Sequence, residues 1–183
     1  YVNSAVVDSV SRTGVHSLMM EDSDSNTAVF NHSTLIYRLS QVNDNLNKDR
    51  IRPGTELTIK GYIMTPSSDK IDGENHAELV IYSYTDLWNI STSEVINKNY
   101  SPDVWHPFEV STVVPEHRQW PNTSSVFLGF RYSQFAGATG KVYFDDVIIS
   151  TSEPMTFFVT DYYDVVTANN STIMSATYLK SLF

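Results

Sequence analysis

The sequence predicts an all-β chain folded as an antiparallel β-sandwich, and three observations support this fold class. Apolar and polar residues alternate with a period of two in seven segments, with β-branched and aromatic residues at the apolar positions. Clusters of Pro, Gly, Asn, Asp and Ser separate the segments, and almost no stretch has a helical period. Several short strands divided by turn residues are typical of sandwiches and barrels.

Each segment with strand periodicity is bounded by residues that favour turns. In chain order, the predicted strands are Ser17–Glu21, Thr34–Leu39, Glu56–Met64, Glu78–Tyr84, Phe108–Val114, Val126–Tyr132 and Lys141–Ser150. The turn residues that precede the last five strands lie at Arg52–Gly54, at Pro66–Asp69 and Ile71–Gly73, at Ser101–Asp103, at Pro121–Asn122 and at Gly137–Gly140.

The character of the chain changes after the last predicted strand. Glu153 and Pro154 end that strand, the next residues are apolar and aromatic, and Ile173–Phe183 has the pattern of a short amphipathic helix. We therefore divide the chain into one domain over residues 1–152 and a tail or connector over residues 153–183. Two interpretations of the tail stay open. It either packs on the same domain as an edge strand, or leads to a following domain or a partner surface.

Composition excludes several classes of function. The chain has 21 Asp and Glu against 12 Lys and Arg, a net charge of −9, which is unsuited to a nucleic-acid partner. It has no cysteine, which excludes disulfides, thiolate metal sites and a cysteine nucleophile. No apolar run approaches the roughly 20 residues of a membrane span. No nucleophile elbow, phosphate loop or dinucleotide fingerprint is present, and we predict a protein that is not an enzyme.

Asn, Ser and Thr together make up 53 of the 183 residues, and six asparagines begin an N-glycosylation sequon. These are Asn31, Asn89, Asn99, Asn122, Asn169 and Asn170. The chain begins at Tyr1, which is typical of a processed protein or a piece of a longer one. We therefore predict a glycoprotein that is secreted or lies on the extracellular surface.

Five motifs occur in an order that resembles a known family. They are Gly14-Val-His-Ser-Leu18, Thr34–Leu39, Arg52-Pro-Gly-Thr-Glu-Leu-Thr-Ile-Lys-Gly-Tyr-Ile63, Trp105-His-Pro-Phe108 with Val113-Val-Pro115, and Val142-Tyr-Phe-Asp-Asp-Val147. Over about residues 12 to 150, this order resembles the carbohydrate-binding modules of the CenC and xylanase-associated type. The resemblance implies a galactose-binding-domain-like β-jelly roll that binds a glycan or polysaccharide.

Two departures from the family pattern concern packing. The family has a strand well before the Gly-x-x-Ser-Leu motif, whereas only Tyr1–Thr13 precede it here. That first strand is either missing or supplied by the tail. Leu57 stands where the family most often has Tyr, which is a conservative change at a packing position.

Sugar recognition needs flat aromatic faces and planar polar groups on a rigid surface. If Leu79 and Ile81 face the core, strand alternation turns Tyr82 and Tyr84 to the opposite face. The same rule turns Phe127 and Arg131 outward, and Arg131 offers a bidentate donor.

Two further aromatic residues are candidates for the same sugar-binding face. Phe30 stands where the resemblance places a ligand-facing Trp, and Trp88 follows Tyr84 on the next loop. Trp88 is next to the Asn89 sequon, and we expect a glycan at Asn89 to crowd this site. The predicted carbohydrate-binding residues are therefore Phe30, Tyr82, Tyr84, Trp88 and Arg131.

Asp145 and Asp146 are the candidate metal ligands. The resemblance implies a structural calcium, held by an aspartate of this last strand and by backbone carbonyls near the Gly-x-x-Ser-Leu turn. Because adjacent strand residues point to opposite faces, we expect only one of the two carboxylates to enter the site. The five histidines have no zinc-binding spacing. Asp22, Asp24 and Asn26 copy the start of a calcium loop, but its required Gly and Glu are absent.

The sequence thus predicts a non-catalytic extracellular glycan-binding module with a structural calcium. One alternative is a structural or assembly domain of a surface filament, adhesin or virion glycoprotein, whose tail contacts neighbouring domains or subunits. Another is an accessory domain of an enzyme that degrades polysaccharides.

Overall fold

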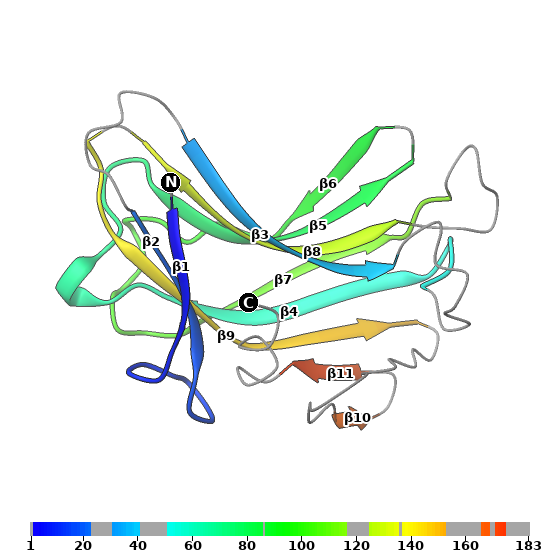
Figure 1. Cartoon of the computed structure of the whole chain (residues 1–183), viewed down its shortest axis with the longest axis horizontal. Coiled ribbons are helices and arrows are strands. Elements are labelled where there is room, and N and C mark those ends of the chain that lie inside the picture. The colour runs from blue at the N-terminus through cyan, green and yellow to red at the C-terminus, as the bar shows by residue number, and fades with distance from the viewer. Residues whose placement is uncertain are drawn as a thin grey trace.

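The computed structural model of the chain describes residues 2–22, 31–40, 51–85, 87–116, 125–135, 137–152, 166–168 and 171–174. These residues form two antiparallel sheets that stack face to face (Figure 1), which confirms the predicted antiparallel β-sandwich. The strands, in chain order, are β1 (Val2–Val7), β2 (Ser17–Asp22), β3 (Asn31–Ser40), β4 (Glu56–Met64), β5 (His76–Tyr84), β6 (Trp88–Thr92), β7 (His106–Val113), β8 (Val126–Gln134), β9 (Lys141–Thr151), β10 (Val166–Ala168) and β11 (Ser171–Met174). No helix among the described residues has the length and apolarity of a membrane span.

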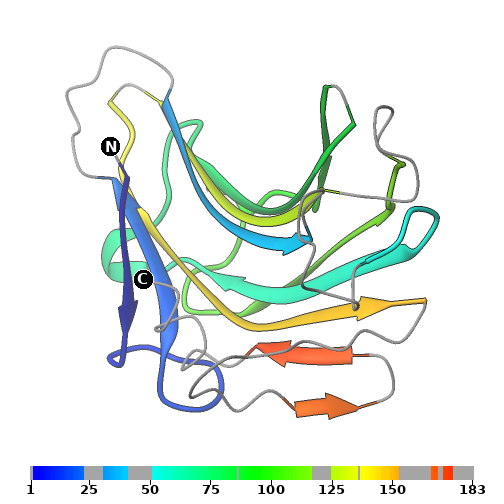
Figure 2. The ribbon, with the colours of Figure 1, turned by 45° about the vertical axis from the view of Figure 1, so that its right-hand side comes forward.

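The smaller sheet has the strand order β3-β8-β5-β6. Its strands bend along their length, so the face that points away from the larger sheet is concave (Figures 1 and 2). β5 and β8 form the middle of the sheet and β6 is one edge. Side chains that alternate outward from β5, β6 and β8 therefore share one hollow surface.

The larger sheet is organised around β9, which has different partners along its length. On one side β9 pairs with β4, which in turn pairs with β7. On the other side β9 pairs first with β2, up to Phe144, and then with β11, from Val147. β1 continues the sheet beyond β2, and β10 continues it beyond β11. Asp145 and Asp146 thus lie at the point where β9 exchanges one neighbour for another.

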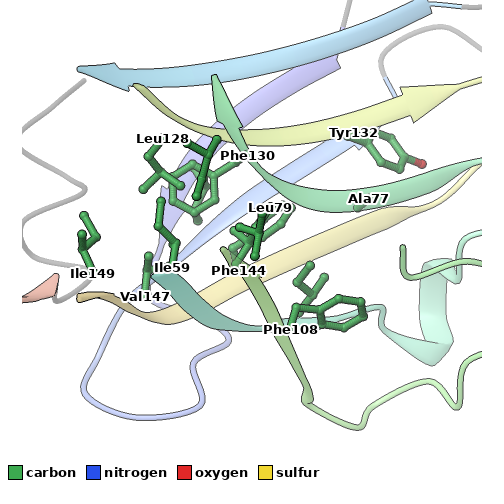
Figure 3. Packing of buried hydrophobic residues seen from close by; sticks show 14 of the residues in the cluster. Ile59, Ala77, Leu79, Phe108, Leu128, Phe130, Tyr132, Phe144, Val147 and Ile149 are labelled. Atoms are coloured by element: carbon green, nitrogen blue, oxygen red, sulfur yellow. The ribbon is translucent and has the colours of Figure 1, made fainter. Parts of the chain in front are cut away.

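The core lies between the two sheets (Figure 3) and is made of the apolar residues that alternate inward. Leu79, Leu128 and Phe130 of the smaller sheet pack with residues of the larger sheet such as Phe144. The Phe130 and Phe144 rings meet edge to face with centroids 5.2 Å apart. Burying such side chains contributes about 1.5 to 3 kcal/mol each, so the core holds the two faces rigidly.

All seven predicted strands are present, with bounds that differ by a few residues. β1, formed by the segment before the Gly14 turn, pairs with β2 and supplies the first strand that the resemblance left open. From the tail, β11 pairs with β9, and β10 pairs with the other side of β11. Residues 173–174 of the predicted helix lie in this strand, and residues 175–183 lie outside the described residues. The division of the chain at residue 152 stays a prediction.

Candidate functional site

Four aromatic rings gather on the concave face, and we call Tyr82, Tyr84, Trp88 and Phe127 the aromatic cluster. Trp88 is its centre. The Trp88 ring centroid lies 5.2 Å from that of Tyr84, 5.5 Å from that of Phe127 and 6.2 Å from that of Tyr82. Tilted and edge-to-face pairs at these separations are favourable for aromatic rings. The cluster is therefore a packed group that fixes the orientation of its own rings.

Strand register explains why these four residues meet. Tyr82 is opposite Phe127 of β8, and Tyr84 is opposite Trp88 of β6. Leu79 and Ile81, the inward residues of β5, are fully buried, so alternation turns both tyrosines to the outer face as predicted. Trp88 lies on an edge strand and remains 56% exposed. The cluster thus presents a large open aromatic surface from a rigid frame.

Arg131 lies on the same face of β8, two outward positions along from Phe127, and it forms an ion pair. Its Nε and Nη2 atoms both donate to Oε1 of Glu78, the Nε hydrogen bond being 2.7 Å long. Glu78 is the register partner of Arg131 on β5, and its side chain is only 3% exposed. The Arg131 side chain is 21% exposed. The guanidinium is thus fixed in place by Glu78, and its side chain remains partly exposed.

The structure brings together most of the predicted sugar-binding residues. Tyr82, Tyr84 and Trp88 form one cluster, with Arg131 farther along the same face. Phe30 lies outside the described residues. Strand alternation also predicts that Phe127 points outward, but Phe127 is not among the predicted site residues. Ile90, an exposed residue opposite Tyr82, was missed because the short strand β6 was not predicted.

The sequons are found in different settings. Asn89 follows Trp88 on β6, and alternation places it on the other face of the strand, where it is exposed. This direction argues against the expectation that a glycan at Asn89 would crowd the site, which stays a prediction. Asn99 is exposed in the segment between β6 and β7, and Asn31 is the first residue of β3. Asn122, Asn169 and Asn170 lie outside the described residues.

Asp145 and Asp146 both turn toward the loop between β1 and β2. Two residues of β9 oppose Gly61 of β4, and Asp146 has a φ of 48°, so the strand contains a β-bulge at this point. A bulge interrupts the alternation of side chains. The expectation that only one of the two carboxylates enters the site is therefore wrong. The inward apolar positions change from Val142 and Phe144 to Val147 and Ile149, and this change of phase was a readable sign of the bulge.

The residues around these carboxylates do not fit a calcium ion. Oδ2 of Asp145 accepts hydrogen bonds from the backbone N–H groups of Arg12, at 2.6 Å, and Thr13, at 3.3 Å. Calcium requires about six to eight oxygen ligands, whereas this turn presents N–H donors. Among the described residues, no group of three or more His, Asp or Glu side chains is arranged to hold a metal. Burial raises the pKa of Asp145, and the N–H donors of Arg12 and Asp146 oppose that rise.

Comparisons with known proteins agree on the fold. One similar solved structure is a carbohydrate-binding module of the β-sandwich superfamily, with a TM-score of 0.51 and 14% identity over 79% of this chain. The match spans about half (51%) of that structure's length. Two others are the CBM22-2 and CBM22-1 xylan-binding domains of Xyn10C from Paenibacillus barcinonensis, with TM-scores of 0.51 and 0.50 and identities of 14% and 15%. Each match covers 82% of this chain, and they cover 88% and 81% of the two domains, respectively.

No known family and no curated protein matches the sequence itself. The resemblance drawn from the order of the motifs is nevertheless confirmed at the level of the fold, because these neighbours are a carbohydrate-binding module of the β-sandwich superfamily and two xylan-binding domains. At these identities the likeness concerns the fold.

Proposed function

We propose that this chain is a non-catalytic module that binds a glycan or polysaccharide on the concave face of its smaller sheet. The aromatic cluster is the observation that carries the proposal, because a half-exposed Trp88 held by three neighbouring rings is a preformed stacking surface. Xylan-binding domains with a similar fold favour a polysaccharide as the ligand class.

The concave face combines two kinds of chemistry that sugars use. The apolar face of a sugar ring packs on an aromatic ring, and its hydroxyl groups form hydrogen bonds to planar polar side chains. The aromatic cluster provides the first kind. Arg131 provides the second, since a guanidinium carries five N–H groups and two of them are used by Glu78. The core beneath both strands holds these groups in place before a ligand arrives, which lowers the entropic cost of binding.

The proposal is tested by binding to soluble xylan and to a panel of other polysaccharides, measured by affinity electrophoresis and calorimetry. We expect Trp88→Ala to weaken binding at least tenfold, about 1.4 kcal/mol, and Tyr82→Ala or Tyr84→Ala to weaken it less. Val113→Ala is the control, because Val113 is 63% exposed on the larger sheet. Wild-type protein that binds none of the panel would remove the proposal and leave the structural or assembly role. Equal affinities for Trp88→Ala and wild type would place the ligand elsewhere.

We also propose that the protein works outside the cell and carries N-linked glycans. Asn89 and Asn99 are both exposed, which supports their access to a glycosylating enzyme. Production in a glycosylating host followed by treatment with an N-glycosidase is expected to reduce the mass of the protein. An unchanged mass would contradict this proposal.

A further inference from the structure

β9 has a gap in its pairing on one side. It leaves β2 at Phe144 and joins β11 at Val147, so no strand of the described chain pairs with Asp145 or Asp146 on that side. The bulge at Asp146 lies in this gap. Two adjacent carboxylates in a gap between strands repel each other unless positive groups are placed nearby. The fold therefore needs a brace at this point.

The loop between β1 and β2 is that brace, because it supplies four hydrogen-bond donors, two from Arg12 and two from Thr13. The backbone N–H groups of Arg12 and Thr13 donate to Oδ2 of Asp145. Nη1 of Arg12 and Oγ1 of Thr13 donate to Oδ2 and Oδ1 of Asp146, respectively. The N–H group of Asp146 donates to the remaining oxygen, Oδ1 of Asp145, at 2.7 Å. All four carboxylate oxygens thus accept a hydrogen bond from the protein itself.

The position of Arg12 is fixed from a second direction. Its guanidinium carbon lies 3.6 Å from the centroid of the Tyr62 ring. Tyr62 lies on β4 and is the register partner of Asp145. One side chain therefore joins the β1–β2 loop, the bulge of β9 and the neighbouring strand β4. A guanidinium is well suited to this because it is planar, remains charged and stacks on aromatic rings.

We propose that Arg12 replaces the structural calcium that the family resemblance implies, so that the sandwich is braced by an arginine and does not depend on calcium. The proposal accounts for the N–H donors that face Asp145 where a cation would need oxygen ligands. It also gives a role to the positive φ of Asp146, because the bulge directs both carboxylates to the same loop. The inference concerns stability and is independent of the proposed glycan binding.

Thermal unfolding tests the proposal. Wild-type protein freed of metal with EGTA and the same protein in millimolar calcium chloride are expected to have the same Tm, to within about 1 °C. Arg12→Met, which removes the charge and keeps most of the side-chain length, is expected to lower Tm by about 5 °C in both buffers. Arg52→Met is the matched control, because Arg52 is exposed in the turn before β4, and it should lower Tm by less than about 1 °C.

Two results would overturn the inference. One is a calcium-dependent rise in the Tm of the wild type that is absent in Asp145→Asn and Asp146→Asn. The other is an Arg12→Met variant no less stable than Arg52→Met. If Arg12→Met does not fold, Arg12→Lys retains the charge without the planar fork and is expected to have an intermediate Tm. Calorimetric titration of the wild type with calcium gives a second reading, and heat of binding at one calcium per chain would also refute the proposal.

Discussion

The outer faces of the two sheets each carry an arginine, a carboxylate and a tyrosine, arranged in opposite ways. On the smaller sheet, Arg131 pairs with Glu78 within the sheet, and the aromatic cluster beside this pair is open. On the larger sheet, Arg12 comes from a loop and lies over the Tyr62 ring. An aromatic ring covered by the chain's own cation serves as part of a brace, whereas an aromatic ring left open can accept a ligand.

The larger sheet also has a hollow of about 330 Å³, lined in part by Lys60, Tyr62, Glu109 and Asp146. Its charged groups are already paired within the protein. Lys60 pairs with Glu109 at 3.0 Å, and Asp146 pairs with Arg12. A hollow alone is therefore a poor guide to function in this molecule, and the use of its side chains by the protein itself decides between the two faces.

The largest effect is expected from breaking the ion pair of the smaller sheet. Arg131→Met leaves the carboxylate of Glu78 buried without its partner, which typically costs about 3 to 5 kcal/mol. For a chain of this size that loss corresponds to a fall in Tm of about 10 °C, measured by scanning calorimetry. It should exceed the effect of Arg12→Met, because Asp146 is more exposed than Glu78.

A double variant sharpens this prediction. Replacing both Glu78 and Arg131 with Met removes the buried charge together with its partner, and such replacements are often neutral for stability. The double variant is therefore expected to recover most of the Tm lost in Arg131→Met. If the double variant is as unstable as Arg131→Met, the unpaired charge of Glu78 is not the cause of the loss.

A smaller effect is expected at the bulge of the larger sheet. Asp146→Ala removes the ion pair with Arg12 and the hydrogen bond from Thr13, and it places Ala at a φ of 48°. Asp146→Asn keeps an acceptor for Thr13, and Asn adopts positive φ more readily than Ala. We expect losses in the free energy of unfolding of about 2 kcal/mol for Ala and about 1 kcal/mol for Asn, measured by urea denaturation. Equal losses for the two variants would contradict this prediction, because they would show that neither the acceptor for Thr13 nor the positive φ at position 146 affects stability.

Sequence reasoning went furthest where one rule decides the structure. Strand alternation predicted the seven main strands and the outward turn of Tyr82, Tyr84 and Phe127, because one buried face fixes the register of a strand. The same rule failed at Asp145 and Asp146, where a bulge interrupts it. Bulges depend on pairing with neighbouring strands, which lies beyond a local pattern.

Contacts between distant segments were the least accessible from sequence. Nothing in the local pattern near Arg12 indicates that its side chain meets Asp146, which lies 134 positions away in the chain. Likewise, β6 is short and sits at an edge, so its alternation was too brief to stand out, and the meeting of Trp88 with Phe127 was not predicted. The sequence predicted which types of residue form the site, but which of them contact one another depends on the strand topology.

The smallest effect is expected at the Asn89 sequon, where the two faces of one strand can be compared. The side chains of Asn89 and Trp88, which are neighbours on β6, point to opposite faces of the strand. Removing a glycan at Asn89 with Asn89→Gln should therefore change the Kd for polysaccharide less than about twofold.

A second variant moves the sequon to the other face of the same strand. Ile90 is 52% exposed, lies opposite Tyr82, and is followed by Ser91 and Thr92. Combining Asn89→Gln with Ile90→Asn therefore moves the sequon by one residue, to the concave face. In a glycosylating host this double variant is expected to lose polysaccharide binding. Treatment with an N-glycosidase, which removes the glycan, should restore the binding in part. Unchanged binding by the glycosylated double variant would mean that the ligand does not lie on the concave face.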